Sequence, residues 1–277
     1  MTAQILDGKL ISQDIVNEVR AKVDARAAQG KRPPCLAVIL VGEDPASQVY
    51  VGNKKRQCAN AGIRSIAYDL PAATTEAELL DLVGQLNADG EVDGILVQLP
   101  LPKHINAETV IEMIDPAKDL DGISPVNIAK VFSGDTSGFA PCTAEAVVCM
   151  LKMNDIALSG KRVAVVGRSM VVGRPLSMLL LHENATVTIC HTRTKDMPSV
   201  TRRAEILIVA AGKPGVVELT MIIDGFSRLV VGWSISLSEN VIAVSDALRH
   251  AMTNHPPCLI YYSDNFLSCL FGSSRRH

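Results

Sequence analysis

Several features are missing from this sequence, and each absence argues against a class of protein. No run of about 18 apolar residues is present, so no membrane-spanning helix is expected. The stretch MTAQILDGKLISQ has no basic segment followed by an apolar one, so no secretory signal is expected and the cytoplasm is the expected location. An excess of cations is also missing, because 27 Lys and Arg stand against 29 Asp and Glu. This balance disfavours broad binding to nucleic acid.

Paired cysteines are missing too. The seven cysteines are odd in number and include no C-x-x-C pair. The sequence therefore predicts neither a disulfide framework nor a metal site, and we expect reduced thiols in the core. With 277 residues, 48% of them hydrophobic, the chain is long enough for one or two domains with an ample core.

Lysine is absent from the last part of the chain. All twelve lysines lie at or before Lys213, whereas six of the ten aromatic residues follow residue 215. Either bias alone is compatible with sampling noise in a short tail. Two opposed biases that change at one place indicate a boundary between sequences of different composition.

Apolar periodicity in the first hundred residues alternates between helix and strand. The spacing predicts helices over 1–30, 45–62 and 75–90, with Thr75 as a cap. Apolar runs predict strands over 35–41, 63–70 and 92–99, and this alternation is typical of parallel βαβ units. Segments 115–127 and 132–142 are expected to be loops.

A second series of elements follows. Helices are predicted over 143–154, 173–184 and 197–204, and strands over 161–167, 185–191 and 205–212. These Val- and Ile-rich strands are typical of a doubly wound sheet. The sequence therefore predicts an α/β fold with two lobes, an N-terminal α/β catalytic lobe and a Rossmann-like lobe. They join near residues 125–145, and a ligand site is expected in their cleft.

A glycine turn separates a predicted strand from a predicted helix in the second lobe. Gly167, Ser169, Val172, Gly173 and Pro175 form the pattern G-x-S-x-x-V-G-x-P, which differs from the standard G-x-G-x-x-G. Glycines permit close approach of the backbone, and a helix N-terminus favours a phosphate. Many glycine turns are only structural, so the nucleotide interpretation depends on this strand-to-helix context.

The following strand ends at a polar and cationic loop with His191, Thr192, Arg193 and Lys195. An NAD-selective fold usually carries Asp or Glu there to hold the ribose 2′-hydroxyl. Cations and hydroxyls suit a 2′-phosphate, so NADP is favoured over NAD, with Arg168 as a second cation. The alternative for these basic residues is a solvated loop.

Four polar residues of the first lobe are candidates for chemistry. Tyr50 and Lys54 lie four residues apart on a predicted helix, hence on one face, although this spacing is common on exposed helices. A phenol and an ammonium of lowered pKa can relay a proton. Gln98 ends a strand, where α/β folds place ligands. Asp121 either accepts hydrogen bonds from the amino-pyrimidine edge of a guanine- or pterin-like ring or forms an Asx turn before Gly122.

Long motifs in a fixed order are more specific than any single residue. They are YVGNKKRQC (50–58), DGILVQLPLP (93–102), KDLDGISPVN (118–127), PCTA (141–144), GRSMVVGRP (167–175), ATVTICHTRT (185–194) and AAGKPG (210–215). On these motifs, residues 1 to about 215 resemble the bifunctional methylenetetrahydrofolate dehydrogenase/cyclohydrolase family, which more often reads P-C-T-P at 141–144.

The resemblance implies the chemistry and the site residues. It implies NADP-dependent oxidation of 5,10-methylenetetrahydrofolate and hydrolysis of the product to 10-formyltetrahydrofolate, by a homodimer. Nucleic-acid and membrane partners are not expected, given the charge balance and the lack of long apolar runs. Lys54 would be the acid-base residue, tuned by Tyr50 and Gln98, while Asp121 anchors the pterin ring. Folate contacts are expected at Tyr50, Val51, Gly52, Asn53, Lys54, Val97, Gln98, Leu99 and Asp121. Cofactor contacts are expected at Gly167, Arg168, Ser169, Gly173, Thr192 and Arg193.

The resemblance also implies a division into a folate-binding catalytic domain (1–125), a truncated NADP-binding domain (126–215) and an atypical α/β tail (216–277). In the tail, the family's I-D-V-G-I-N and P-G-G-V-G-P-M-T segments are absent as such. Residues 216–265 instead resemble the middle of an integrase-like transposase core, with Asp264 as one metal-binding carboxylate. No Asp or Glu follows Asp264, so a two-metal site cannot be completed.

The tail keeps an α/β pattern, with strands predicted over 219–224, 228–236 and 258–264 and a helix over 239–252. Docking on the open edge of the second sheet and disorder are both left open. Two alternatives to a folate enzyme also stay open. One is an inactive fusion protein that retains partial ligand binding. The other is a functioning transposase, which the missing carboxylates disfavour.

Overall fold

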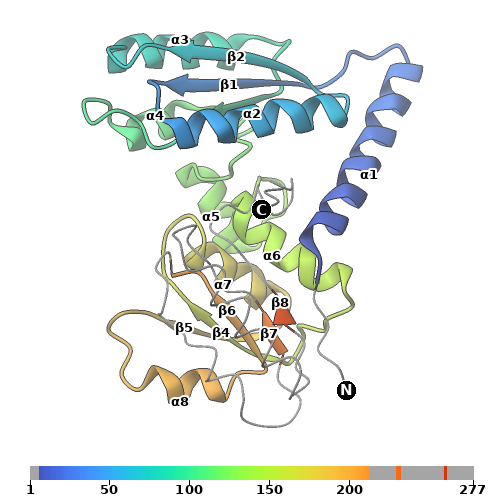
Figure 1. The fold of residues 1–277 in the computed structure, drawn as a ribbon, viewed down its shortest axis with the longest axis vertical. Helices are drawn as coiled ribbons and strands as arrows, with labels where there is room; N and C mark the ends of the chain where they lie inside the picture. The colour runs from blue at the N-terminus through green and yellow to red at the C-terminus, as the bar shows by residue number, and fades with distance from the viewer. Residues whose placement is uncertain (1–5, 212–228, 232–258, 261–277) are drawn as a thin grey trace, which may run out of the picture. The chain divides into compact units, whose positions relative to one another are not determined.

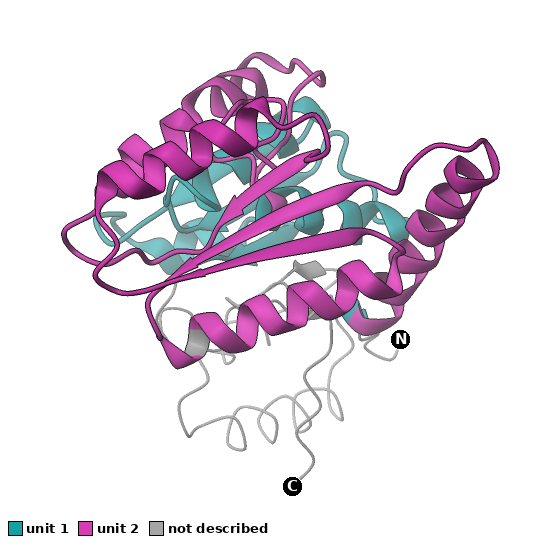
Figure 2. Cartoon of the chain, turned by 90° about the horizontal axis from the view of Figure 1, so that it is seen from above, with its two compact units in different colours: residues 1–8, 143–269 teal, residues 9–142, 270–277 magenta. Residues whose placement is uncertain are grey.

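The computed structural model describes residues 6–211, 229–231 and 259–260. The chain forms two compact units, coloured separately in Figure 2. Among the described residues, unit 2 holds 9–142, and unit 1 holds 6–8 and those from 143 onward. Within the described part of the chain, no helix is both long and apolar enough to cross a membrane.

Unit 2 is built on a three-stranded parallel sheet with the strand order β2-β1-β3. Its elements, labelled in Figure 1, are α1 (Gly8–Ala28), β1 (Cys35–Val41), α2 (Pro45–Asn60), β2 (Arg64–Leu70), α3 (Glu76–Ala88), β3 (Gly94–Val97), α4 (Ala107–Met113) and α5 (Pro125–Ser133). The helix and strand predictions for 1–99 are confirmed, with α1 beginning at Gly8 in the described chain.

The two faces of this sheet bury alternate residues of β1, as a pleated strand requires. Ala37, Ile39 and Val41 pack with apolar residues of α3 and α4 on one face. Leu36, Val38 and Leu40 pack with Val51 of α2 on the other. Helix α2 therefore covers one face, and α3 and α4 cover the opposite face (Figure 1).

Local signals set where these helices begin. Asp44 caps α2 by accepting a hydrogen bond from Ser47 N, and Pro45 occupies the first turn, where a missing N–H costs nothing. Thr75 and Glu78 form a reciprocal capping box at the start of α3, which confirms the predicted cap.

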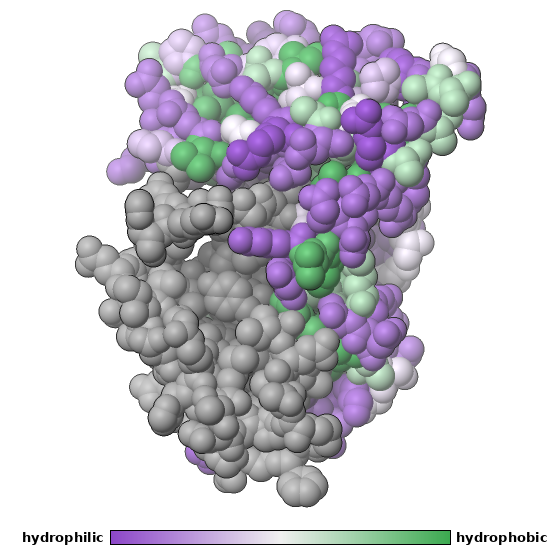
Figure 3. All heavy atoms as spheres, turned by 45° about the vertical axis from the view of Figure 1, so that its right-hand side comes forward, coloured by the Kyte–Doolittle hydropathy of each residue, from purple (hydrophilic) through white to green (hydrophobic). Residues whose placement is uncertain are grey.

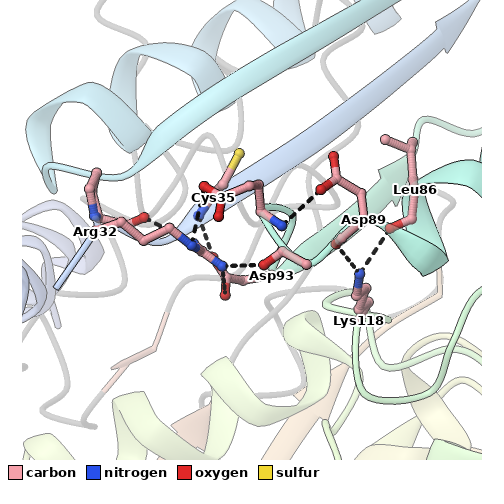
Figure 4. Close-up of polar contacts among 9 residues, drawn as sticks. Arg32, Cys35, Leu86, Asp89, Asp93 and Lys118 are labelled. Atoms are coloured by element: carbon pink, nitrogen blue, oxygen red, sulfur yellow. Dashed lines mark hydrogen bonds and ion pairs between the residues drawn. The ribbon is translucent and has the colours of Figure 1, made fainter.

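Polar side chains tie the loops together at the N-terminal ends of β1 and β3 (Figure 4). The Arg32 guanidinium donates to both carboxylate oxygens of Asp93, at 2.6 and 3.0 Å, and the same carboxylate accepts from Cys35 N at 2.7 Å. Lys118 Nζ donates to the carbonyls of Leu86, Asn87 and Asp89 at the end of α3. The last carbonyls of a helix accept no hydrogen bond from within the helix, and Lys118 supplies the missing donor here.

Unit 1 contains a parallel sheet with the strand order β5-β4-β6-β7-β8. Its elements are α6 (Cys142–Met153, beginning at the unit boundary), β4 (Arg162–Val166), α7 (Gly173–His182), β5 (Thr186–Cys190), α8 (Met197–Arg202), β6 (Ile206–Val209), β7 (Leu229–Val231) and β8 (Leu259–Ile260). Ala164, Val166 and Leu207 pack with Met197 and Val200 of α8, which gives this sheet its own core.

The loop prediction for 115–127 is partly wrong, because α5 begins at Pro125 after its cap Ser124. Helix α4 was not predicted at all. In the tail, β7 lies within the predicted strand 228–236 and β8 within 258–264, and both extend the sheet beyond β6. The predicted strand 219–224, the predicted helix 239–252 and Asp264 lie outside the described residues.

Cysteine placement differs in part from the expectation of core thiols. None of the described cysteines forms a disulfide, and Cys35 and Cys190 are buried, but Cys142 is exposed. On the face shown in Figure 3, hydrophobic groups of the described residues form separate islands among hydrophilic ones.

Candidate active site

Helix α2 carries Tyr50 and Lys54 on neighbouring turns. Val51 is buried against the sheet, and Lys54, three residues further on, is only 8% exposed. The Lys54 Nζ lies 4.7 Å from the centroid of the Tyr50 ring. The expectation that these two residues share a helix face is confirmed. The alternative, that they form an ordinary pair on an exposed helix surface, is wrong because Lys54 is buried.

Burial dominates the electrostatics of this pair. Desolvation lowers the pKa of Lys54 below its ordinary 10.5, while Asp121, Cys142 and Cys58 oppose that shift. Desolvation also raises the pKa of Tyr50, and Asp121 and Cys142 add to this increase. A lysine that gives up its proton more readily is suited to transferring protons near neutral pH, because its neutral form becomes accessible.

Asp121 faces this pair from the turn before α5. Burial raises the pKa of its carboxyl, Lys54 counteracts this, and Asp119 raises the pKa further. No residue in the described part of the chain donates a hydrogen bond to the Asp121 carboxylate. The Asx turn considered for Asp121 is therefore not formed, and the neighbouring Asp119 carboxylate accepts instead from Ser124 N, at the start of α5, at 2.8 Å. Asp121 is therefore available to accept hydrogen bonds from a ligand.

Gln98 extends the ladder at the end of β3. Its N–H donates to Ile39 O at 2.9 Å, and its Nε2 donates to Leu99 O at 2.6 Å. Leu96 packs on the face of the sheet that α2 covers. Side chains two residues apart on an extended strand lie on the same face, so Gln98 is directed toward the α2 side as well. Its Oε1 is buried with no partner among the described residues. A buried acceptor of this kind costs about 1–3 kcal/mol unless a donor reaches it, which a ligand can supply.

Cys142 belongs to the same cluster, although it was not predicted as a site residue. Its Sγ donates to Leu120 O at 2.9 Å, its N–H donates to Asp121 O at 3.4 Å, and it influences both Lys54 and Tyr50 electrostatically. The only signal in the sequence was the motif PCTA.

The other predicted folate contacts divide into buried and accessible residues. Val51 and Val97 are buried in the cores on opposite faces of the sheet. Gly52 has open space around its Cα, and Asn53 Oδ1 accepts from Arg56 Nη2 at 2.7 Å. Leu99 lies before a cis bond to Pro100. The direct ligand contacts of these residues stay predictions.

The glycine turn of unit 1 follows β4 and leads into α7, as the sequence predicted. A Cβ on Gly167 would lie 2.2 Å from Ala210 O, and the residue has φ +140°, while a Cβ on Gly173 would lie 2.3 Å from Gly167 O. Both positions therefore require glycine. Ser169 Oγ accepts from Val172 N and Gly173 N and holds the turn closed.

This turn fits a phosphate. Within the described residues, the N–H groups of 168–171 donate to no acceptor, and α7 begins at the end of the turn. Gly167 N donates to Cys190 O at 2.8 Å, which brings the loops after β4 and β5 together. Unpaired N–H groups near a helix N-terminus are a suitable environment for an anion.

The loop after β5 adds positive charge beside the turn. Thr194 Oγ1 accepts from His191 N, and His191 Nδ1 accepts from Arg193 N, so the backbone of this loop is held by its own side chains. Thr192 and Arg193 are exposed, as is Arg168. No carboxylate in the described part of the chain forms an ion pair with Arg168, Arg193 or Lys195. These cations are available to an anionic ligand.

Comparison with family models gives two matches. Residues 6–121 match the catalytic domain of tetrahydrofolate dehydrogenase/cyclohydrolase, and residues 141–254 match the NAD(P)-binding domain of the same enzyme. The second match extends past residue 215, where the motif resemblance ended. The bifunctional protein FolD of Agathobacter rectalis is 50% identical over 230 residues, which are 83% of this chain and 82% of the relative.

Solved structures agree with this assignment. A bifunctional methylenetetrahydrofolate dehydrogenase/cyclohydrolase from Campylobacter jejuni has a TM-score of 0.87 at 38% identity, covering 97% of this chain and 94% of that one. The corresponding enzyme of Trypanosoma brucei, solved with NADP and an inhibitor, has a TM-score of 0.84 at 30% identity, covering 98% and 95%.

Proposed function

Because the chain belongs to the tetrahydrofolate dehydrogenase/cyclohydrolase family, we propose that it oxidises 5,10-methylenetetrahydrofolate with NADP and hydrolyses the resulting methenyl cation to 10-formyltetrahydrofolate. The buried Lys54, with its lowered pKa beside Tyr50 and Asp121, is the observation that carries this proposal. It supplies the acid-base group that the hydrolytic step requires.

The first step moves a hydride from the one-carbon bridge and leaves a methenyl cation on the folate. Bound NADP supplies the hydride acceptor. The protein contributes alignment, because a hydride transfer between two bound partners depends on their distance and orientation. Asp121, whose carboxylate accepts no hydrogen bond from the described residues, is proposed to hold the amino edge of the pterin ring.

The second step adds water to the methenyl carbon and opens the ring: the water gives up both of its protons, of which one is released to the solvent and one is transferred to the departing ring nitrogen. Lys54 is proposed to carry this proton, with Tyr50 maintaining its orientation. Gln98 is proposed to present its unpaired Oε1 to the folate or to Lys54. General acid-base catalysis of this kind contributes about 10²–10⁴-fold to a rate.

The cofactor is proposed to bind on unit 1. The backbone around Gly167, Arg168, Ser169 and Gly173 forms a cradle that a Cβ would fill, and its N–H groups suit a phosphate. Arg168, Thr192 and Arg193 are proposed to hold the ribose 2′-phosphate, which favours NADP over NAD. The similar enzyme of Trypanosoma brucei was solved with NADP.

We further propose that residues 1–125 form the folate domain, that 126–215 form the NADP domain, and that 216–277 are an atypical tail. A homodimer in the cytoplasm, with a role in purine biosynthesis through its formyl donor, is proposed from the family resemblance. An inactive fusion protein that still binds ligands is the alternative that the unusual tail suggests.

The test is turnover by the purified full chain. With methylenetetrahydrofolate and NADP, we expect reduced cofactor to form and the methenyl product to decay to the formyl compound. Lys54→Met keeps a side chain of similar volume at the buried position, and we expect it to lower the rate of methenyl hydrolysis by about 10²–10⁴-fold. Lys55→Met is the matched control, because Lys55 is the next residue of α2 and pairs only weakly with Asp69, at 3.8 Å. Wild-type protein that binds NADP without turnover would refute the enzyme and support the alternative.

A further inference from the structure

The segment between β3 and α5 contains a carboxylate that the proposed chemistry does not use. Asp119 is 1% exposed. Its carboxylate accepts hydrogen bonds from Ser124 N at 2.8 Å, from Asn127 Nδ2 at 2.9 Å and, more weakly, from Ile123 N at 3.4 Å. The anion lies at the N-terminus of α5, where the backbone N–H groups and the helix dipole favour negative charge.

Asn127 connects this carboxylate to two other segments. It is fully buried, and its Nδ2 also donates to Pro116 O at 3.0 Å, while its Oδ1 accepts from Phe139 N at 3.3 Å. A side chain that joins three segments by satisfied hydrogen bonds has one low-energy position. Asp119 and Asn127 therefore hold both ends of the turn that carries Asp121.

The turn itself leaves little freedom to Asp121. Gly122 N donates to Asp119 O at 3.2 Å, and Gly122 has φ +65°. A Cβ on Gly122 would lie 2.4 Å from Ala140 O, so the backbone passes close to the segment before α6. On that side, Cys142 donates to the carbonyls of both Leu120 and Asp121.

The charges around Asp121 come from three elements. Lys54 and Tyr50 face it from α2, Cys142 faces it from the start of α6, and Asp119 belongs to its own turn. The anionic Asp119 raises the pKa of Asp121, in addition to the larger effect of burial. Removing that negative charge should therefore lower the pKa of Asp121.

We propose that Asp119 is a positioning residue of the folate site: with Asn127 it sets the place of the Asp121 carboxylate opposite Lys54, and its negative charge lies two residues from that carboxylate in the same turn. This inference rests on the proposed function, because it assigns Asp121 to the folate. Asp119 itself does not touch the ligand, since its carboxylate is enclosed by protein donors.

Two variants separate the effect of the Asp121 position from the effect of the Asp119 charge. Asp119→Asn keeps the shape and removes the charge, whereas Asn127→Ala keeps the Asp119 charge and removes its side-chain donor. We expect each to raise the KM for methylenetetrahydrofolate by about tenfold and to leave the KM for NADP unchanged. Only Asp119→Asn should shift the pH profile of kcat/KM for the folate, with the limb controlled by Asp121 moving to lower pH.

The control is Thr75→Ala, which removes the cap of α3 in the same unit and costs about 1 kcal/mol of stability. It should lower the melting temperature without changing either KM or the pH profile. Asn127→Ser replaces Asn127→Ala if the alanine variant does not fold. Equal increases in both KM values, or an unshifted pH profile in a folded Asp119→Asn protein, would overturn the inference.

Calorimetric measurement of tetrahydrofolate binding separates a failure of the proposed function from a failure of the role proposed for Asp119. Wild-type protein that does not bind tetrahydrofolate refutes the proposed function and this inference together. Wild-type protein that binds it, with Asp119→Asn binding equally well at every pH, refutes only the role of Asp119. Weaker binding by Asp119→Asn with a shifted pH dependence supports that role.

Discussion

Replacing Gly173 by alanine tests whether the turn before α7 is a phosphate site. The added methyl group would lie 2.3 Å from Gly167 O, 2.5 Å from Gly167 C and 2.8 Å from Arg168 N. Carbon atoms in favourable contact are about 3.5–4.0 Å apart, so the turn has to move by about 1 Å. All three neighbours are backbone atoms, which means that no side chain can rotate away to relieve the overlap.

Two effects of known size follow from this displacement. Overpacking costs about 1–3 kcal/mol of stability. Losing one charge-assisted hydrogen bond to a phosphate costs about 1.5–3 kcal/mol, which is about 10–150-fold in Kd. We therefore expect calorimetry to show at least about tenfold weaker NADP binding by Gly173→Ala, with tetrahydrofolate binding unchanged because Lys54 and Asp121 belong to unit 2.

Gly90→Ala is the matched control, because a Cβ at Gly90 would meet nothing within 4 Å. It should bind NADP as the wild type does. A folded Gly173→Ala protein with wild-type affinity for NADP would show that this turn does not hold the phosphate, because the added methyl group displaces the backbone that would donate to it.

Three further predictions concern single side chains. Because burial lowers the pKa of Lys54 below 10.5, the cyclohydrolase rate should rise with pH as the neutral amine forms, with the midpoint of the rise below pH 10.5; Lys54→Arg should lose this rise in a pH-rate profile. Leu79→Ala should lower the free energy of unfolding by about 2–5 kcal/mol in urea denaturation, because Leu79 is fully buried; an unchanged midpoint would contradict this. Arg193→Ala should reduce the preference for NADP over NAD by about tenfold in competition binding, whereas an unchanged ratio would show that Arg193 does not contact the 2′-phosphate.

Strong local signals made most of the elements predictable. The strand over 35–41 is a continuous run of buried apolar residues, and α3 begins at the predicted Thr75 cap. Helices α4 and α5 have only 7 and 9 residues. Such short helices are not stable by propensity. They depend on tertiary contacts, such as the burial of Val110 against α3 and the Asp119 carboxylate at the start of α5.

In the candidate site, too, some features follow from the local sequence and others from tertiary contacts. The sequence placed Tyr50 and Lys54 on one helix face, because helical spacing is a local property. It left open whether Asp121 was a ligand or an Asx turn, because two aspartates in one turn are locally equivalent. In the structure Asp121 forms no Asx turn among the described residues, whereas the Asp119 carboxylate accepts from Ser124 and Asn127. It also added Cys142, which a distant motif brings beside Leu120.

Helices α4 and α5 apart, the sequence was sufficient to predict the α/β class, the elements up to residue 211, the family and the glycine turn. These follow from short-range periodicity, from caps and from motifs that need no knowledge of distant partners. Which polar groups are buried, and which lack a partner among the described residues, depends on the tertiary structure. Those properties determine the proton affinities of Lys54 and Asp121 and the open acceptor on Gln98, because desolvation depends on every element packed around a side chain.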